Sequence, residues 1–272
     1  MFHVKHFVKI KKEEMYMAKV IAVANQKGGV GKTTTSVNLA AVLGELGKKT
    51  LLVDMDAQGN ASTGLGIEKR ELKSSIYNVI VGEISMENAI IKGKFENLDI
   101  CPSGLDLAGA EVELISVEER EFTLKNCLNT VSDRYDYIII DCPPSLGLIT
   151  INCLTAADSV LIPLQCEYYA LEGVSQLIST IKKIKKSLNP DIEIEGVLLT
   201  MLDARTNLGL QVVEEVKRFF PGKVYASIIP RNVRLSEAPS FGLPITKYDA
   251  HSRGAESYIA LGKEVIENNP QI

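Results

Sequence analysis

The sequence has few cysteines, and they stand apart from one another. Cys101, Cys127, Cys142, Cys153 and Cys166 are the only five in 272 residues, and no two form a C-x-x-C pair. Structural zinc sites and disulfide frameworks need numerous or closely spaced cysteines, so both are disfavoured. The scattered thiols favour a cytosolic protein with reduced cysteines.

Long hydrophobic runs and an excess of positive charge are also missing. No apolar run approaches the roughly 20 residues that a membrane-spanning helix needs. The segment 256–272 lacks the cationic apolar stripe of a helix that lies on a membrane, so no stable membrane association is expected. The formal net charge is −4, and any affinity for DNA therefore has to come from a local basic patch.

What the sequence does contain is an alternation of strand-like and helix-like segments. Helical periodicity separates runs that are rich in Ile, Val and Leu, as expected for buried parallel strands. The strand-like runs are 19–25, 50–56, 98–103, 135–143, 159–165, 192–203 and 223–230, and helical patterns cover 33–47, 173–188 and 208–220. This order predicts an α/β fold with a doubly wound, mostly parallel sheet flanked by helices. We expect one domain over residues 17–272, with residues 66–95 as a peripheral excursion of short helices.

A glycine-rich segment stands directly between the first strand and the first helix. It reads Lys27, Gly28, Gly29, Val30, Gly31, Lys32, Thr33 and Thr34. Glycines allow several backbone N–H groups to converge on phosphate oxygens, and the helix N-terminus adds partial positive charge. Lys32 is placed to contact the β- and γ-phosphates, and Thr33 to bind Mg²⁺. Gln26 replaces the first glycine of the usual P-loop, so the segment predicts a variant P-loop that binds ATP.

Acidic residues end two of the predicted strands. Asp141 follows an apolar run, as a Walker B aspartate does near Mg²⁺. Asp54 and Asp56 end another run, and the period of two predicts that both point to the same side of that strand. The carboxyl edge of such a sheet is where ligands bind. We expect one of these two carboxylates to orient the attacking water and the other to support the metal.

These motifs together resemble the deviant Walker ATPases of the ParA/Soj chromosome-partitioning family. The resemblance rests on KGGVGKTTT, VDMDAQGNAS and IIIDCPPSLG, and on LQCEYYALEG, LLTMLDARTN and IPRNVRLSEAPSFG. It runs from about Lys19 to the C-terminus. The resemblance implies the deviant P-loop NTPase fold, Mg²⁺-dependent ATP hydrolysis and a cytoplasmic, nucleoid-associated protein.

The resemblance also implies roles for single residues. Lys27 matches the signature lysine that reaches the nucleotide of the partner subunit in an ATP-bound dimer. Lys32 and Asp56 match residues needed for hydrolysis, and Thr33, Asp56 and Asp141 are expected around Mg²⁺. Met201, Pro230 and Asn232 fall where the family packs against adenine and recognises it.

Three partners follow from the same resemblance. They are a second copy in the ATP state, double-stranded DNA bound without sequence preference, and a ParB-like protein that stimulates hydrolysis. Arg205 and Arg234 are the expected DNA contacts, and ordinary surface ion pairs are the alternative for both. The cargo, a chromosome or a plasmid, stays open, as does a role in replication initiation or sporulation.

Other functions of the same fold remain as alternatives. A MinD-like positioning ATPase needs an amphipathic C-terminal helix, and an iron-protein-like electron carrier needs cysteines that bridge a cluster. A regulator without turnover is disfavoured because Asp56 is retained. Residues 1–16 do not belong to the resemblance and are predicted to be a disordered extension, with Met1, Met15 and Met17 as alternative starts of translation.

Overall fold

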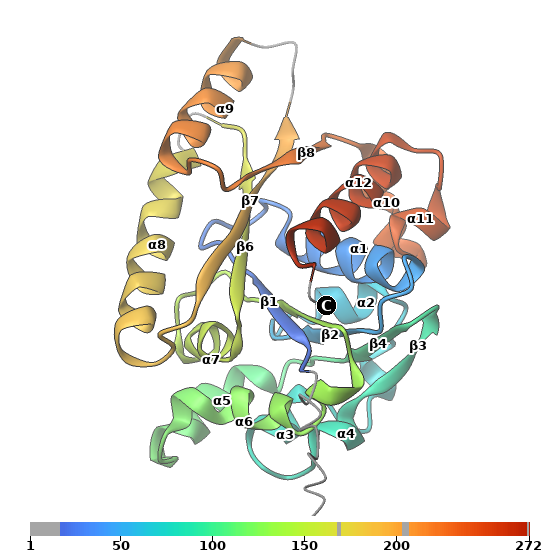
Figure 1. Ribbon diagram of the computed structural model, residues 1–272. Helices are drawn as coiled ribbons and strands as arrows, with labels where there is room; N and C mark the ends of the chain where they lie inside the picture. Colours follow the sequence, from blue (N-terminus) through green and yellow to red (C-terminus); the bar gives the residue numbers. More distant parts are fainter. Residues whose placement is uncertain (1–16, 168–169, 203–206, 271) are drawn as a thin grey trace, which may run out of the picture.

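A single mixed sheet forms the centre of the chain (Figure 1). The computed structural model describes residues 17–167, 170–202, 207–270 and 272. Within these residues the strand order is β3-β4-β2-β5-β1-β6-β7-β8, and all neighbours are parallel except β3 and β4. The strands are β1 Lys19–Val23, β2 Thr50–Asp54, β3 Ile91–Phe95, β4 Leu98–Cys101, β5 Tyr137–Asp141, β6 Ser159–Gln165, β7 Glu193–Leu202 and β8 Val224–Pro230.

Helices cover both faces of this sheet. One face carries α1 Lys32–Glu45, α2 Asn60–Gly64, α10 Val233–Glu237, α11 Ile245–Tyr248 and α12 Arg253–Asn268. The other face carries α3 Ile76–Ile80, α4 Met86–Ala89, α5 Leu107–Glu113, α6 Thr123–Asn129, α7 Leu148–Ala156, α8 Ala170–Ser187 and α9 Asn207–Phe219. Short 3-10 helices are η1 Lys69–Glu71, η2 Leu114–Ser116, η3 Arg120–Phe122, η4 Ser132–Arg134 and η5 Ala238–Phe241. The predicted doubly wound fold is therefore confirmed.

The central strand β1 shows why its sequence is apolar throughout. Ile21 and Val23 pack into the core beneath α1 and α12, whereas Val20 and Ala22 pack into the core on the opposite face. Because both faces are covered, a continuous hydrophobic run replaces the alternation of a half-exposed strand. β1 lies between β5 and β6. The connections on the two sides of β1 lead to opposite halves of the sheet, so the loop after β1 lies where the direction of winding changes. Open α/β sheets bind ligands at such a point.

The excursion at residues 66–95 was only partly predicted. It contains the short helices η1, α3 and α4, as expected, but its last five residues form the edge strand β3. β3 pairs antiparallel with β4 through a tight turn in which Asn97 has a φ of 53°. The prediction of helices alone was wrong here, because an edge strand gains its stability from the neighbouring strand rather than from its own IKGKF pattern.

The C-terminal helix α12 uses its apolar face inside the core. Tyr258, Leu261 and Val265 are buried with residues of α1 in the same core. Over the described part of the chain, no helix combines the length and apolar character needed to cross a membrane. The extension predicted at residues 1–16 lies outside the described residues.

Candidate nucleotide site

The glycine-rich loop joins the carboxyl end of β1 to the start of α1. Gly29 and Gly31 have φ angles of 74° and 90°, which residues with a Cβ rarely adopt. Gly31 is the N-cap of α1, and no side chain caps the helix. No acidic residue stands in its first turn either. The N-terminus of α1 therefore keeps its positive potential for an anionic ligand.

Lys32 is a buried lysine that lacks an ion pair with any described carboxylate. Its side chain is on the first turn of α1, and the residue is 7% exposed. Its Nζ donates a hydrogen bond of 3.3 Å to the carbonyl of Lys27. Burial lowers the pKa of Lys32, and the nearby Asp141 opposes this effect. A buried cation without a close counter-ion suits a phosphate, which would compensate its charge.

Asp141 lies at the end of β5 with no exposed surface. Its Oδ1 accepts a hydrogen bond of 2.8 Å from Ser36, whereas its Oδ2 is buried without a partner among the described residues. Burial first, and then the neighbouring Asp54, raise the pKa of Asp141 to about 7, while hydrogen bonding from Ser36 and Thr33 opposes the increase. An unpaired buried carboxylate oxygen beside a P-loop fits a metal ion or its bound water.

Asp54 and Asp56 have different environments, contrary to the expectation that both project from one strand. β2 ends at Asp54, and Asp56 lies in the turn beyond it. Asp54 is fully buried and accepts hydrogen bonds from Ser62 N at 2.8 Å and Ser62 Oγ at 2.7 Å. Its Oδ1 also accepts the N–H of Asp56 at 3.2 Å. Asp54 therefore fixes the turn. Asp56 is partly exposed; its Oδ1 accepts the N–H of Gln58 at 2.9 Å, and its second oxygen can face a ligand.

Lys27 lies at the beginning of the glycine-rich loop and carries a charged partner of its own. Its Nζ is 2.8 Å from Glu167 Oε2, just beyond the end of β6, and its side chain is 36% exposed. The hydrogen bond from Lys27 is the main reason why the pKa of Glu167 is lowered. In this single chain Lys27 thus points toward β6, and it must leave Glu167 before it can reach a second molecule.

A pocket lies beside the loop and gathers the three residues predicted for adenine. It is lined by Gly31, Thr34, Thr200, Met201, Ile229, Pro230, Arg231, Asn232, Leu235, Ser236 and Tyr258. Met201 adopts a φ of 52°, which is uncommon for a residue with a side chain. Asn232 caps α10 by accepting the N–H of Arg234 at 2.8 Å, so its amide N–H₂ group is not used by that contact. The pocket therefore combines an apolar wall with a polar amide beside the phosphate loop.

Two members of this region were missed in the sequence. Thr200 Oγ1 donates to the carbonyl of Val30 at 2.9 Å, which ties β7 to the loop. The Tyr258 hydroxyl lies 3.2 Å from Thr35 Oγ1, which ties α12 to α1. Both contacts join residues far apart in sequence, so no local pattern could have indicated them.

The two arginines predicted to bind DNA have different outcomes. Arg234 is exposed, and it pairs with Glu237 at 2.9 Å and with Asp249 at 3.4 Å. These contacts are of the kind expected from the surface-ion-pair alternative, and they leave the DNA role a prediction. Arg205 lies outside the described residues.

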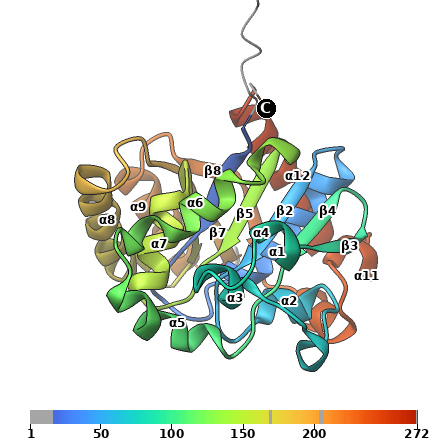
Figure 2. The ribbon, with the colours of Figure 1, turned by 90° about the horizontal axis from the view of Figure 1, so that it is seen from below.

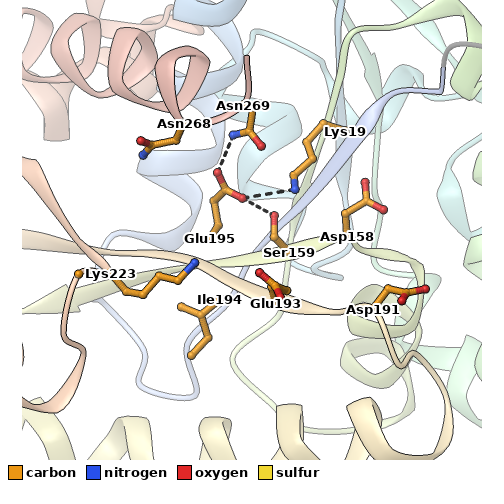
Figure 3. A pocket seen from close by; sticks show the side chains of 11 residues that line it. Lys19, Asp158, Ser159, Asp191, Glu193, Ile194, Glu195, Lys223, Asn268 and Asn269 are labelled. Atoms are coloured by element: carbon orange, nitrogen blue, oxygen red, sulfur yellow. Dashed lines mark hydrogen bonds and ion pairs between the residues drawn. The ribbon is translucent and has the colours of Figure 1, made fainter. Parts of the chain in front are cut away.

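A larger cavity opens at the opposite, amino-terminal edge of the sheet (Figure 3). Glu195 lies within it and accepts hydrogen bonds from Ser159 at 2.6 Å and Asn269 at 2.7 Å. Lys19 Nζ is 3.6 Å from the same carboxylate. These partners satisfy Glu195, and the cavity is far along the strands from the glycine-rich loop. The network therefore joins β1, β6, β7 and the end of α12 rather than forming part of the nucleotide site.

Comparisons with known proteins agree over most of the chain. The profile of a family described as AAA domain matches residues 18–194. The sporulation initiation inhibitor protein Soj of Bacillus subtilis is 62% identical over 252 residues, which cover 93% of this chain and 100% of Soj. The chromosome partitioning protein ParA of Myxococcus xanthus is 54% identical over 253 residues, covering 93% of this chain and 89% of ParA.

A solved structure extends the comparison to three dimensions. The crystal structure of cobyrinic acid a,c-diamide synthase from Mycobacterium smegmatis, with bound ADP and magnesium, is 37% identical and superposes with a TM-score of 0.83. The match covers 93% of this chain and 96% of that one. Similarity therefore extends over both the sheet and the helices around the candidate site.

Proposed function

Because the chain belongs to the ParA/Soj family of P-loop ATPases, we propose that it binds and hydrolyses ATP with Mg²⁺ as a dimerising switch in chromosome partitioning. The observation that carries the proposal is that two buried charged groups beside the glycine-rich loop each keep bonding capacity that the described residues do not use. Lys32 lacks an ion pair with a described carboxylate, and Asp141 Oδ2 lacks a hydrogen-bond partner. ATP supplies a counter-charge for the first group, and a cation supplies one for the second.

In this proposal, different residues bind ATP and promote its hydrolysis. Gly28, Gly29, Val30 and Gly31 present backbone N–H groups to the phosphates, with Lys32 and Thr34 beside them. Met201 and Pro230 pack against adenine, and Asn232 recognises its edge. Asp56 orients the attacking water, whose oxygen forms a bond to the γ-phosphorus as the bond to the bridging oxygen of ADP breaks.

Thr33, Asp56 and Asp141 are the residues that would hold Mg²⁺, and the ion supplies charge neutralisation at the phosphate oxygens. The described residues form no cluster of three or more acidic, His or Cys side chains that could hold a metal alone. The hydroxyl of Thr33 and the carboxylates of Asp56 and Asp141 are donors that suit Mg²⁺, which is usually bound by one or two carboxylates together with substrate phosphates and water.

Lys27 gives a reason for dimerisation. Charge builds on the phosphate oxygens during hydrolysis, and a cation supplied by a second subunit stabilises it. In this proposal, Lys27 exchanges its ion pair with Glu167 for the nucleotide of the partner. That exchange links dimer formation to the presence of ATP.

DNA binding, the stimulating partner and nucleoid localisation complete the proposal. The ATP-bound dimer binds double-stranded DNA without sequence preference through Arg205 and Arg234, and a ParB-like protein accelerates hydrolysis. Slow hydrolysis suits this role, because the lifetime of the dimer then sets the time spent on DNA. The name of the Myxococcus xanthus relative, chromosome partitioning protein ParA, supports partitioning as the process, whereas the name of Bacillus subtilis Soj refers to sporulation.

The proposal is tested by retention of a random DNA duplex on the protein with ATP-Mg²⁺ and, in parallel, with ADP-Mg²⁺. Retention with ATP alone is expected, and Lys32→Ala should abolish it together with tight ATP binding. Retention that is equal in both nucleotides would contradict the switch. ATP-dependent dimerisation without any retention would favour a positioning ATPase of the MinD type, although the apolar face of α12 is already occupied by the core.

A further inference from the structure

Helix α5 and the residues just before and after it carry apolar side chains on two opposite sides. Leu107, Ala110 and Leu114 are buried in the core. Across the helix, Leu105 is 73% exposed, Val112 70% and Ile115 65%. Ala108 and Gly109 are also exposed, and their spacing places them on the same side as Val112. We call this exposed side, made of Leu105, Ala108, Gly109, Val112 and Ile115, the outer face of α5.

An uncovered apolar face of this kind is unusual for a surface helix. Helices at a surface normally bury one apolar stripe and expose charge, and a helix that is apolar on both sides is normally buried. Among the described residues, four of the ten exposed large hydrophobic side chains fall within residues 105–117. Contiguous exposed apolar groups mark interaction sites. Figures 1 and 2 both place α5 at the periphery of the molecule.

Charge indicates what kind of partner fits the outer face. Residues 105–119 contain five acidic residues, Asp106, Glu111, Glu113, Glu118 and Glu119, and no lysine or arginine. The next residue, Arg120, is engaged with the carbonyl of Ile115 and with Glu121. Lys69, Arg70 and Lys73 line a cavity with Leu105, at the other end of the face. The end near Glu113 and Glu119 is therefore acidic, and a second copy of this acidic chain complements it less well than a basic segment does.

Helix α5, which carries the outer face, is hydrogen-bonded to the start of α7, and α7 follows the loop after Asp141. Glu111, on the same helix, accepts the N–H of Ile149 at 3.3 Å through its Oε1. The same carboxylate lies against Gly147, in the loop that connects Asp141 to α7, so a side chain of α5 contacts this loop. Tyr77 donates to Glu113 at 2.7 Å and holds α5 from the other side. A partner bound to α5 would therefore act on the loop that follows Asp141, the proposed Mg²⁺ ligand.

We infer that the outer face of α5 binds an amphipathic, basic segment of a partner protein, with its apolar side on Val112 and Ile115 and its cations near Glu113, Glu118 and Glu119. An amphipathic helix binds an apolar surface through anchors spaced three, four and seven residues apart. Binding there gives a partner a route to the loop after Asp141. This regulatory consequence rests on the proposed ATPase function, whereas the binding itself does not.

The test measures fluorescence anisotropy of a labelled 18-residue peptide of Leu, Ala and Lys, with leucines at helical spacing, on the full-length protein. The matched control peptide has the same sequence with glutamate in place of every lysine. The wild-type chain is expected to bind the Lys peptide and not the Glu peptide. The double variant Val112→Ser/Ile115→Ser should weaken binding about tenfold or more, and Glu118→Lys/Glu119→Lys should do the same. All four side chains are exposed, so the fold should tolerate the changes.

Leu210→Ser is the control, because Leu210 is 51% exposed on α9 and should leave peptide binding unchanged. Equal binding by wild type and by both double variants would overturn the inference, as would no binding by the wild type. Loss of ATP-dependent dimerisation in Val112→Ser/Ile115→Ser, with peptide binding retained, would assign the face to a second copy instead. DNA retention with ATP-Mg²⁺, measured on the same wild-type preparation, reports separately on the proposed function.

Discussion

At the scale of single residues, the site separates acids that build the structure from acids that face a ligand. Asp54 is satisfied by Ser62 and by the backbone of Asp56, whereas Asp56 remains partly exposed. Asp141 is buried with one oxygen unpaired. The sequence shows three similar carboxylates at strand ends, and only their contacts distinguish them.

Asp56→Ala is expected to bind ATP with wild-type affinity but to hydrolyse it at least about a hundredfold more slowly, since general-base groups contribute about that much. The unhydrolysed ATP should then keep the chain dimeric. Single-turnover hydrolysis and sedimentation in the presence of ATP-Mg²⁺ measure the two effects. Wild-type turnover in this variant would remove Asp56 from catalysis.

Asp141→Asn should stabilise the nucleotide-free protein at pH 8 while it weakens Mg²⁺-dependent ATP binding. Burial raises the pKa of Asp141 to about 7. A carboxyl with a raised folded-state pKa adds stability in its protonated form. That stability is fully present below the ordinary pKa of 3.8 and is lost as pH rises from there through about 7. Asparagine stays neutral, so the variant should avoid this loss.

The measurement is the urea midpoint of both proteins at pH 8 and pH 5 without nucleotide. The difference between them should be largest at pH 8 and should shrink toward pH 5, where the wild-type carboxyl is protonated. A lower midpoint for Asp141→Asn at pH 8 would contradict the proposed destabilisation by the buried charge.

At the scale of elements, the ends of β2 and β4 and the helix α2 meet at one serine. Ser62, in α2, donates to Asp54 at 2.7 Å and accepts the N–H of Ser103 at 3.0 Å. All three residues are fully buried. The turn that carries Asp56 is therefore fixed by a small buried polar network.

Ser62→Ala should reduce the free energy of unfolding by about 1–3 kcal/mol, because the N–H of Ser103 and one bond to Asp54 lose their buried partner. Urea unfolding followed by circular dichroism provides the measurement. Ser187→Ala is the control, since Ser187 is exposed and donates only to the carbonyl of Lys183 within α8. Equal midpoints for the two variants would show that the network contributes little.

The elements also show which features a sequence can and cannot predict. The strands of the parallel sheet and helix α1 follow from apolar runs and periodicity, because both faces of the sheet are covered. β3 was missed, since the pairing with β4 stabilises it. The glycine loop, Lys32 and Asp141 could be placed from spacing alone. The ion pair of Lys27 with Glu167 and the contact of Tyr258 with Thr35 join distant residues, so only the folded chain reveals them.

At the scale of the whole molecule, the net charge of −4 opposes DNA, and binding must depend on a few local cations. Arg234 is one of the two arginines predicted for this role, and its pairs with Glu237 and Asp249 hold its side chain at the surface. DNA would have to compete with these acids for the guanidinium. Because both pairs are exposed, each contributes little to stability and can be exchanged for a phosphate.

Arg234→Ala should therefore weaken the ATP-dependent binding of all DNA sequences alike. A plot of log affinity against log salt concentration should become less steep by about 0.9 for each phosphate contact that is lost. Arg134→Ala is a matched control, because Arg134 is also exposed and ion-paired, to Glu87, but lies by α4, on the opposite face of the sheet from α10. If Arg234→Ala keeps the wild-type slope, Arg234 serves only in its ion pairs, and other cationic side chains form the DNA-binding surface of the dimer. If only Arg234→Ala changes the slope, the ion pairs are the resting state of a DNA contact.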